Sequence, residues 1–402
     1  MVAHPGIRSH YSQSYRPYRF DSACSIVRRK QRYGLTKMRQ LRFLVALACT
    51  VPAFMFFIMK SYEKANFTVT EPAKTQLNCS TMLHRIQLPY RAILIDLDVL
   101  QSIDRSECKE INQRIRLAVD VKDLNTTDKI NYNDFEILYY KTDPMKDYLV
   151  VYDSPIRIIP RFPLMAHGNL SVPTNPRRFI EYWKRSKFIP CLGLKMERNL
   201  TSSYLPVQKT IQTMSSLMNY LIGFDIYPIL NGGSHLGWYR ECGIIPHTQD
   251  VDFGAHIAQY KPELLDDLLK GRTFRLKRKF GRPNDSMEFT ILPHSEGRPM
   301  MDLFWMYSNA NETWVAGTGG DGTKYKYTYP LLNESCAGEL YGHIFWVPCR
   351  PKDVLEAEYG PKWYLDHPTS QFWWSSSQHN VKKNGKWSKA EMSEVYKVYT
   401  LK

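Results

Sequence analysis

The chain has 402 residues, of which 43% are hydrophobic and 23% are charged. These values exclude a wholly disordered or collagen-like chain, and the length allows two domains of ordinary size. The formal net charge is +15, but residues 1–42 contain ten Lys or Arg and one acid, so they account for +9 of it. Because most of the basicity belongs to this tail, the charge does not indicate a nucleic-acid surface, and we predict no nucleic-acid partner.

An uncharged segment follows the basic tail. Residues 43–59 are 17 residues without a charge, and a helix of that length spans roughly 26 Å, close to the thickness of thin secretory-pathway bilayers. The cations before it predict a cytosolic tail at 1–42, a single-pass type II membrane anchor at 43–59 and a lumenal remainder. The alternatives are a buried core helix or a cleaved signal peptide, although the latter begins nearer the N-terminus.

Two further patterns favour the secretory lumen. Asn-x-Ser/Thr sequons are more frequent than chance predicts, as in glycoproteins. Beyond the anchor the number of cysteines is even, which predicts disulfides in an oxidising compartment and leaves their pairing open. The sequons begin at Asn66, Asn78, Asn125, Asn169, Asn199, Asn284, Asn311 and Asn333. The cysteines are Cys79, Cys108, Cys191, Cys242, Cys336 and Cys349.

The remainder predicts an α/β (α+β) protein with a polar stem at 60–82 and two domains. The first domain, at 83–203, contains strand-like segments rich in β-branched and aromatic residues at 91–100, 135–140 and 148–160. In the second domain, at 204–402, helical and strand-like patterns alternate, which predicts a mixed sheet. The expected helices are 207–221, 234–242 and 261–271, and the expected strands are 226–230, 250–254, 273–280, 287–292 and 299–307.

Two local signals refine the second domain. Val207, Ile211, Met214, Met218 and Leu221 recur at helical spacing, so we expect them to form one buried face. Pro228 lacks a backbone N–H, which predicts that the strand at 226–230 lies at a sheet edge or enters the sheet irregularly.

The first candidate site feature is the turn Gly232-Gly233-Ser234 between an expected strand and helix. Paired glycines let backbone amides approach an anion, and a helix N-terminus favours phosphate. Ser234 is a candidate helix cap or phosphate ligand. An ordinary Asn-Gly-Gly turn is the alternative.

The second feature is Asp250-Val251-Asp252. Residues i and i+2 of a strand point to the same face, so the two carboxylates repel each other unless a cation or proton separates them. Hard oxygen ligands of this kind suit Mg²⁺ or Mn²⁺, which in turn bind phosphates. A solvated strand end is the alternative.

The third feature is Asp302, which interrupts an otherwise apolar strand. A carboxylate is costly to bury there unless it is paired or binds a metal, and an Asp–Arg structural pair is the alternative. Together, a Gly-Gly-Ser turn, an Asp-x-Asp pair and a third aspartate on a later strand form a nucleotidyltransferase pattern, in which carboxylate-bound metals hold a displacement at phosphorus. Arg240 follows the turn closely and is a candidate for neutralising phosphate charge, or an ordinary surface arginine.

The stretch at 231–254 resembles the signature of the fukutin and LicD family, and its Trp-Tyr-Arg-Glu-Cys-Gly-Ile-Ile-Pro run and Asp-Val-Asp are most similar to fukutins. The strand around Asp302 and a Val-Pro…Tyr-Gly element at 345–360 add to the resemblance, which covers about 205–365. His235 departs from the family pattern, in which a small or apolar residue often follows the turn. Residues 61–200 carry no motif that transfers.

The resemblance implies a nucleotidyltransferase-like fold and transfer of a phosphorylated alcohol from a CDP-linked donor to a glycan hydroxyl. Fukutins transfer ribitol 5-phosphate to the O-mannosyl glycan of dystroglycan in the Golgi, and LicD proteins transfer phosphocholine. The expected protein is therefore a Golgi membrane enzyme, or an endoplasmic reticulum one, that uses a CDP-alditol and Mg²⁺ or Mn²⁺. Its expected partners are the membrane, a glycoprotein acceptor and other Golgi glycosylation enzymes.

The resemblance also implies roles for individual residues. Asp250, Asp252 and Asp302 would be catalytic metal ligands, with Asp302 a ligand or the base that accepts the acceptor proton. The donor phosphates would be held by Gly232, Gly233, Ser234 and Arg240. For Trp238, Tyr239 and His247, packing is a simpler interpretation than substrate contact.

Three other interpretations stay open from the sequence. A metal-dependent glycosyltransferase that uses a nucleotide sugar would share the anchor, the lumenal position and an Asp-x-Asp pair. A non-catalytic Golgi adaptor would keep the fold without the reaction. Asp96-Leu97-Asp98 resembles the first motif of haloacid-dehalogenase-type phosphatases, but the rest of that set is missing, so we interpret it as a strand end.

Overall fold

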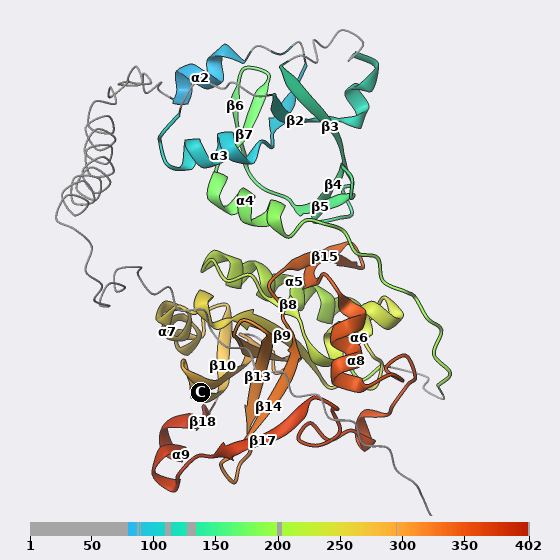
Figure 1. Cartoon of the computed structure of the whole chain (residues 1–402), viewed down its shortest axis with the longest axis vertical. Helices are drawn as coiled ribbons and strands as arrows, with labels where there is room; N and C mark the ends of the chain where they lie inside the picture. The colour runs from blue at the N-terminus through green and yellow to red at the C-terminus, as the bar shows by residue number, and fades with distance from the viewer. Residues whose placement is uncertain are drawn as a thin grey trace, which may run out of the picture. The chain divides into compact units, whose positions relative to one another are not determined.

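The computed structural model describes residues 79–400, except 87, 89, 109–113, 127–133, 199–202 and 295. The described residues belong to one compact unit with two β-sheets, each of which mixes parallel and antiparallel pairs (Figure 1). The expected α/β class is therefore confirmed.

The predicted tail at 1–42 and anchor at 43–59 lie outside the described residues and stay predictions. Among the helices that the structure describes, none has the length and apolar character needed to cross a membrane.

The first sheet has seven strands in the order β5-β4-β3-β2-β1-β7-β6. Helices α3 and α4 pack against each other, and α4 also contacts β5 and β7 (Figure 1). The strands are β1 (Ala92–Leu94), β2 (Ile115–Asp120), β3 (Phe135–Thr142), β4 (Tyr148–Tyr152), β5 (Arg157–Pro160), β6 (Leu164–His167) and β7 (Leu170–Pro173). The helices are α2 (Cys79–Arg85), α3 (Leu97–Asp104), η1 (Val121–Thr126) and α4 (Pro176–Lys184).

The strand predictions in this region have mixed outcomes. The segment 135–140 is confirmed within β3, whereas 148–160 forms the two antiparallel strands β4 and β5 because the chain reverses between them. The prediction of one strand over 91–100 is wrong beyond Leu94. There the Asp96 carboxylate accepts hydrogen bonds from the N–H groups of Asp98 and Val99, at 3.1 and 3.0 Å, and caps α3. This capping role agrees with the structural interpretation of the second Asp-x-Asp pair.

The second sheet has eleven strands. Eight follow the order β15-β16-β8-β9-β12-β11-β10-β18, while β13, β14 and β17 continue from β12 by antiparallel pairing. The strands are β8 (Ile229–Leu230), β9 (Asp250–His256), β10 (Phe274–Arg282), β11 (Asp285–Pro293), β12 (Met300–Ser308), β13 (Glu312–Thr318), β14 (Thr323–Pro330), β15 (Ser335–Leu340), β16 (His343–Pro348), β17 (Val381–Lys386) and β18 (Tyr396–Val398). The predicted consecutive strands are thus confirmed in β10, β11 and β12.

The helices of this region surround the second sheet. They are α5 (Val207–Gly223), α6 (Gly232–Glu241), η2 (Ile257–Gln259), α7 (Pro262–Lys270), α8 (Pro351–Tyr359), η3 (Thr369–Gln371) and α9 (Lys389–Val395). Helix α5 contacts β16, α6 contacts β9, α7 contacts β10, and α6 and α8 lie side by side (Figure 1). Ile211, Met214, Met218 and Leu221, on the predicted face of α5, are at most 1% exposed.

Two predictions about the centre of the sheet need correction. Of the two placements that Pro228 predicted for strand β8, the edge position is wrong, since β8 pairs with β16 on one side and β9 on the other. Pro228 precedes the strand, so its missing N–H costs no ladder hydrogen bond. Helix α6 begins at Gly232, two residues before the predicted start, so both glycines of the turn belong to its first turn.

All six cysteines expected in the lumen are paired, which confirms the prediction of disulfides. The pairs are Cys79–Cys108, Cys191–Cys242 and Cys336–Cys349. The predicted stem at 60–82 overlaps α2, which begins at the first of these cysteines.

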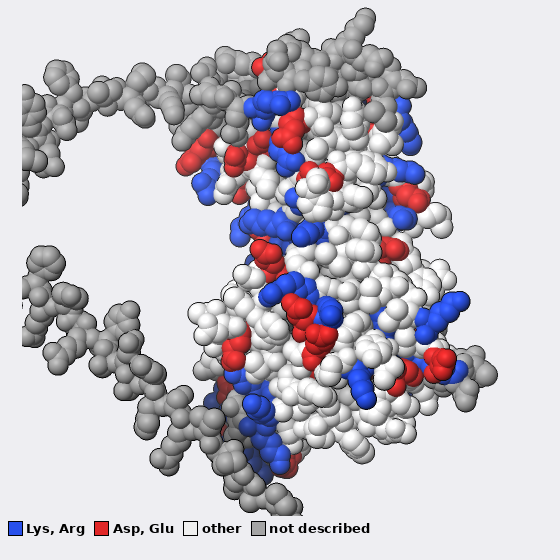
Figure 2. Space-filling model, turned by 45° about the vertical axis from the view of Figure 1, so that its right-hand side comes forward, with Lys and Arg blue, Asp and Glu red and all other residues white. Residues whose placement is uncertain are grey.

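Charges of both signs are mixed on one face of the described residues. On the face that Figure 2 shows, Lys and Arg side chains are interspersed with Asp and Glu side chains. Pairs such as Lys184–Glu181 (2.7 Å) and Lys326–Glu312 (2.8 Å) illustrate this mixing. The nine surplus charges of residues 1–42 lie outside the described residues.

Candidate active site

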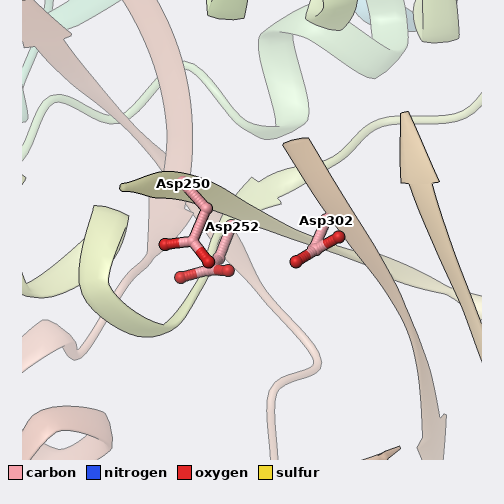
Figure 3. Close-up of side chains that lie close together, drawn as sticks. All are labelled: Asp250, Asp252 and Asp302. Carbon is pink, nitrogen blue, oxygen red and sulfur yellow. The ribbon is translucent and has the colours of Figure 1, made fainter. Parts of the chain in front are cut away.

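The three predicted aspartates come together at the centre of the second sheet. Asp250 and Asp252 lie on one face of β9, and the parallel register of β12 places Asp302 directly opposite Asp252. One carboxylate oxygen from each residue lies within 4.8 Å of the others. Figure 3 shows the three side chains pointing into one space from two neighbouring strands.

The Gly-Gly-Ser turn packs directly against this cluster. Gly233 donates its backbone N–H to Oδ2 of Asp252 at 3.2 Å, and the Ser234 hydroxyl oxygen accepts the backbone N–H of Asp252 at 2.8 Å. Gly232 has φ +50°, and a β-carbon there would lie 2.9 Å from Oδ2 of Asp252. The turn therefore positions a carboxylate, and the prediction that these three residues hold donor phosphates stays a prediction.

Asp302 is held by a polar side chain from the next strand. Thr290, on β11, is fully buried and donates its hydroxyl to Oδ1 of Asp302 at 2.5 Å. The Thr290 oxygen accepts in turn from Nε of Arg278, on β10, at 3.0 Å. Nη2 of Arg278 lies 3.9 Å from Oδ1 of Asp302. The predicted alternative of an Asp–Arg structural pair is thus present only as this long contact.

Burial and mutual repulsion dominate the electrostatics of the cluster. Burial raises the pKa of Asp250, and burial with the neighbouring Asp250 and Asp302 raises the pKa of Asp252 well above its usual range. Burial also raises the pKa of Asp302 to about 6, although the Thr290 hydrogen bond and Arg278 act in the opposite direction. Three carboxylates at this spacing repel one another as anions unless a cation lies beside them, and their hard oxygens fit Mg²⁺ or Mn²⁺.

Arg240 lies at the cavity wall, but its guanidinium is already engaged inside the protein. The residue is 1% exposed, and Nη1 donates to the carbonyl of Leu365 at 2.8 Å. Nε donates to Glu241 at 2.9 Å, and Nη2 pairs with Glu241 and, at 3.3 Å, with Asp366. Its predicted contact with donor phosphates stays a prediction, and the structure gives this arginine a structural setting.

The other residues considered near the motif also have internal partners. Trp238 is fully buried, and His235 stacks on it at 5.9 Å between ring centres. Burial lowers the pKa of His235 to about 3, so this departure from the family pattern is a neutral core side chain. His247 lines the cavity and contacts Thr369 at 2.8 Å and Asp366 at 3.1 Å.

A cavity of about 830 Å³ opens over the aspartates and adds residues that the sequence patterns missed. Two are buried acids: Glu288, on β11, and Glu358, on α8, at 8% and 3% exposure. An acid inside the apolar strand 287–292 is the same signal that identified Asp302, so Glu288 was open to prediction. The cavity lining also includes a cation and several aromatic side chains: Arg278, Tyr327, Tyr329, Tyr359, Trp363, Phe372 and Trp374.

Comparison with known protein families matches both parts of the chain. Residues 78–190 match the N-terminal domain of W02B3.4-like proteins. Residues 226–350 match the nucleotidyltransferase domain of the LicD/FKTN/FKRP family, a range that contains all three aspartates.

Individual relatives fall into two groups. The Caenorhabditis elegans proteins W02B3.4 and T07A5.1 are 42% and 36% identical, over 80% and 86% of this chain and 85% and 94% of their own lengths. Mouse ribitol-5-phosphate transferase FKTN is 32% identical over 58% of this chain, and the match spans about half (51%) of the mouse protein. The human protein of the same name is 31% identical over 57% of this chain and 50% of its own length. The chain therefore belongs to the family of W02B3.4 and T07A5.1 and, through its nucleotidyltransferase domain, to the LicD and fukutin family.

Proposed function

We propose that this protein transfers a phosphorylated alditol of the ribitol 5-phosphate type from a CDP-linked donor to a hydroxyl of a glycoprotein glycan. One observation carries the proposal: the in-register pairing of Asp302 with Asp252, which completes a three-carboxylate cluster beside the Gly-Gly turn. The name of the FKTN relatives, ribitol-5-phosphate transferase, supports the choice of transferred group.

The donor set of the cluster fits a divalent cation. Asp250, Asp252 and Asp302 would hold Mg²⁺ or Mn²⁺, which when bound offsets the negative charge of a diphosphate and of the reacting phosphoryl group. The first turn of α6 faces the same carboxylates, because the Gly233 N–H bonds to Asp252. This contact fixes the carboxylate before any donor arrives.

The proposed reaction is a displacement at phosphorus. The acceptor oxygen forms a bond to the phosphorus of the alditol phosphate, and the bond from that phosphorus to the oxygen bridging it to CMP breaks. CMP leaves with the bonding electron pair, while the acceptor proton passes to a carboxylate of the site. Asp302 is the candidate acceptor of this proton in the alternative in which Asp250 and Asp252 alone hold the cation, since it faces the space that all three share (Figure 3).

We also propose that the protein acts in the Golgi lumen, next to the membrane in which the segment at 43–59 would anchor it. Three disulfides support an oxidising compartment. The four sequon asparagines within the described residues that have a defined exposure are all exposed: Asn169, Asn284, Asn311 and Asn333. In that compartment the protein would meet its glycoprotein acceptor and other glycosylation enzymes.

A donor screen tests the proposal. The purified lumenal chain is incubated with an acceptor glycoprotein, Mg²⁺ or Mn²⁺, and either CDP-ribitol, CDP-glycerol, CDP-choline or common UDP- and GDP-sugars. We expect turnover with a CDP-alditol, loss of turnover in EDTA, and loss by roughly 100-fold or more in Asp250→Asn and Asp252→Asn with folding retained. The control is Asp266→Asn, on the exposed side of α7.

The screen also separates the competing functions. Turnover with nucleotide sugars alone would replace the proposal with a glycosyltransferase. Absence of turnover together with absence of metal-dependent nucleotide binding would replace it with a non-catalytic adaptor. Unchanged activity in Asp250→Asn or Asp252→Asn would remove the metal assignment.

A further inference from the structure

Two arginines line the cavity, and they differ in what their guanidinium groups already bind. Arg240 donates through Nε, Nη1 and Nη2 to Glu241, Leu365 and Asp366, and its side chain is only 2% exposed. Binding a phosphate at Arg240 would require breaking several hydrogen bonds of a buried guanidinium, including the charged ones to Glu241 and Asp366, which is costly.

Arg278 has the opposite character. Its side chain is 33% exposed and lines the cavity, and only Nε makes a hydrogen bond among the described residues, to the Thr290 hydroxyl oxygen. The four N–H groups on Nη1 and Nη2 therefore stay available. Nη2 lies 3.9 Å from Oδ1 of Asp302, and the guanidinium carbon lies 5.8 Å from the ring centre of Phe280, which also lines the cavity.

The hydrogen bond from Nε of Arg278 to Thr290 fixes the position of the N–H groups on Nη1 and Nη2. Thr290 bridges Arg278 and Asp302, accepting from the arginine and donating to the aspartate. The two-nitrogen end of the guanidinium is thereby held beside the third carboxylate. A phosphate bound at the carboxylate cluster would meet this end, whose planar fork matches two phosphate oxygens.

We propose that Arg278 is the arginine that binds the transferred phosphate, on the side of the cluster opposite the Gly-Gly turn. The inference rests on the proposed function and adds to it a catalytic residue outside the family motif. Arg278 donates hydrogen bonds to non-bridging oxygens of the alditol phosphate and stabilises the charge that grows on them as CMP leaves. Arg240 instead positions α6 and the segment around Asp366.

The first test compares the binding of ligands with two, one and no phosphates. Binding of CDP, CMP and cytidine is measured by calorimetry in Mn²⁺ with the folded lumenal chain, for the natural protein and for Arg278→Gln. We expect Arg278→Gln to lower the affinity for CDP by about tenfold and to leave cytidine binding unchanged, because only the second phosphate reaches Arg278. Arg275→Gln, from the same strand but outside the cavity lining, is the matched control and should leave all three unchanged.

The second test is kinetic. With a CDP-alditol as donor, Arg278→Gln should reduce kcat by roughly 100-fold, as expected for a lost donor to the transition state, and Arg278→Lys should restore part of it. If Arg278→Gln does not fold, both CDP binding and kcat are measured on Arg278→Lys. This variant keeps the positive charge but lacks the two-nitrogen end of the guanidinium. Equal kcat and CDP affinity in the natural protein and a folded Arg278 variant would overturn the inference.

The two hypotheses fail in different ways. If the natural protein turns over no CDP-linked donor, the proposed function fails before any variant is measured. If the natural protein is active and Arg278→Gln matches Arg275→Gln in every measurement, only the role of Arg278 fails. If Arg240→Lys lost CDP affinity while its stability stayed unchanged, the phosphate role would return to Arg240.

Discussion

Gly232 and Asp252 are so close that a β-carbon on the glycine would lie 2.9 Å from Oδ2 of the carboxylate. Residue 232 also has φ +50°, a left-handed conformation that side chains other than glycine rarely adopt. The glycine thus permits the helix start and the candidate metal ligand to occupy neighbouring space. Several expected outcomes depend on such contacts.

Gly232→Ala should displace Asp252 and reduce the activity by about tenfold or more, because the added methyl group would clash with the carboxylate. The free energy of unfolding should fall by about 1 kcal/mol, from the strained backbone. Donor turnover measures the activity, and urea unfolding measures the free energy of unfolding. Gly223→Ala, at a helix position with open space around it, is the control and should retain full activity. Equal activity in the two variants would refute the positioning role of Gly232.

Arg240→Ala should destabilise the protein by about 1.5–3 kcal/mol, because it removes hydrogen bonds to the half-buried Glu241 and Asp366, while Arg198 stays bonded to both. Burial raises the pKa of Asp366, but hydrogen bonds from Arg198 and His247 lower that pKa to about 2, so its ionised form is favoured at neutral pH. Urea unfolding measures the change. Exposed Arg272→Ala is the control. A stable Arg240→Ala with a raised KM for the donor would instead support the phosphate role predicted from the sequence.

Thr290→Val should raise the pKa of Asp302, since burial already raises it and the Thr290 hydrogen bond opposes that rise. Activity requires the ionised carboxylate, so the acidic limb of the profile of kcat/KM against pH should move to higher pH. The profile is measured between pH 5 and 8. Thr210→Val removes a buried hydroxyl that has no partner among the described residues and should leave the limb in place. An unmoved limb in Thr290→Val would mean that this hydrogen bond does not tune the site.

Glu358→Gln should change how stability depends on pH. Burial raises the pKa of Glu358 from 4.5 to about 7, against hydrogen bonds from Tyr329 and Tyr359. The folded state then binds the proton more tightly than the unfolded state, so stability is full below pH 4.5 and falls as pH rises through 7. The variant lacks this loss, and its Tm relative to the natural protein should increase between pH 5 and 8 in EDTA. Exposed Glu356→Gln should show no such trend.

Expression in a secretory host tests the compartment. We expect enzymatic removal of N-glycans to shift the protein to lower mass, and Asn→Gln at the exposed sequons Asn169, Asn284, Asn311 and Asn333 to remove part of that shift. A protein with no glycan shift and with reduced cysteines would contradict the lumenal proposal. Alkylation of free thiols with and without reductant supplies the second readout.

The sequence predicted the elements that depend on local pattern. Asp250 and Asp252 are neighbours on one strand, and the stripe on α5 follows helical spacing, so both were available from residue spacing alone. Asp302 was found because a charge in an apolar strand is unusual. Its closeness to Asp252 depends on strand order and register, which no local pattern contains.

Other contacts were hidden from the sequence for the same reason. The internal partners of Arg240 include Asp366, which lies 126 residues later in the chain. Arg278 was not among the candidates from the sequence, since only the pairing of β10 with β11 brings it to Thr290 and so to Asp302. Segment 148–160 was predicted as one strand because both halves carry the same residue types, although Asp153-Ser154-Pro155 between them is a turn signal that the prediction did not use.

The parallel pairing of β9 with β12 also makes the site intolerant of small changes in chain length. Side chains alternate along a strand, so a one-residue deletion between the cis Arg298-Pro299 bond and Asp302 would turn the carboxylate to the opposite face and bring Leu303 opposite Asp252. The shift would also place the carboxylate where the fully buried Met301 now lies, which is costly without a partner. Insertions and deletions in this short stretch therefore damage both the core and the site, whereas the same changes in the exposed turn at 309–311 leave the aspartates in register.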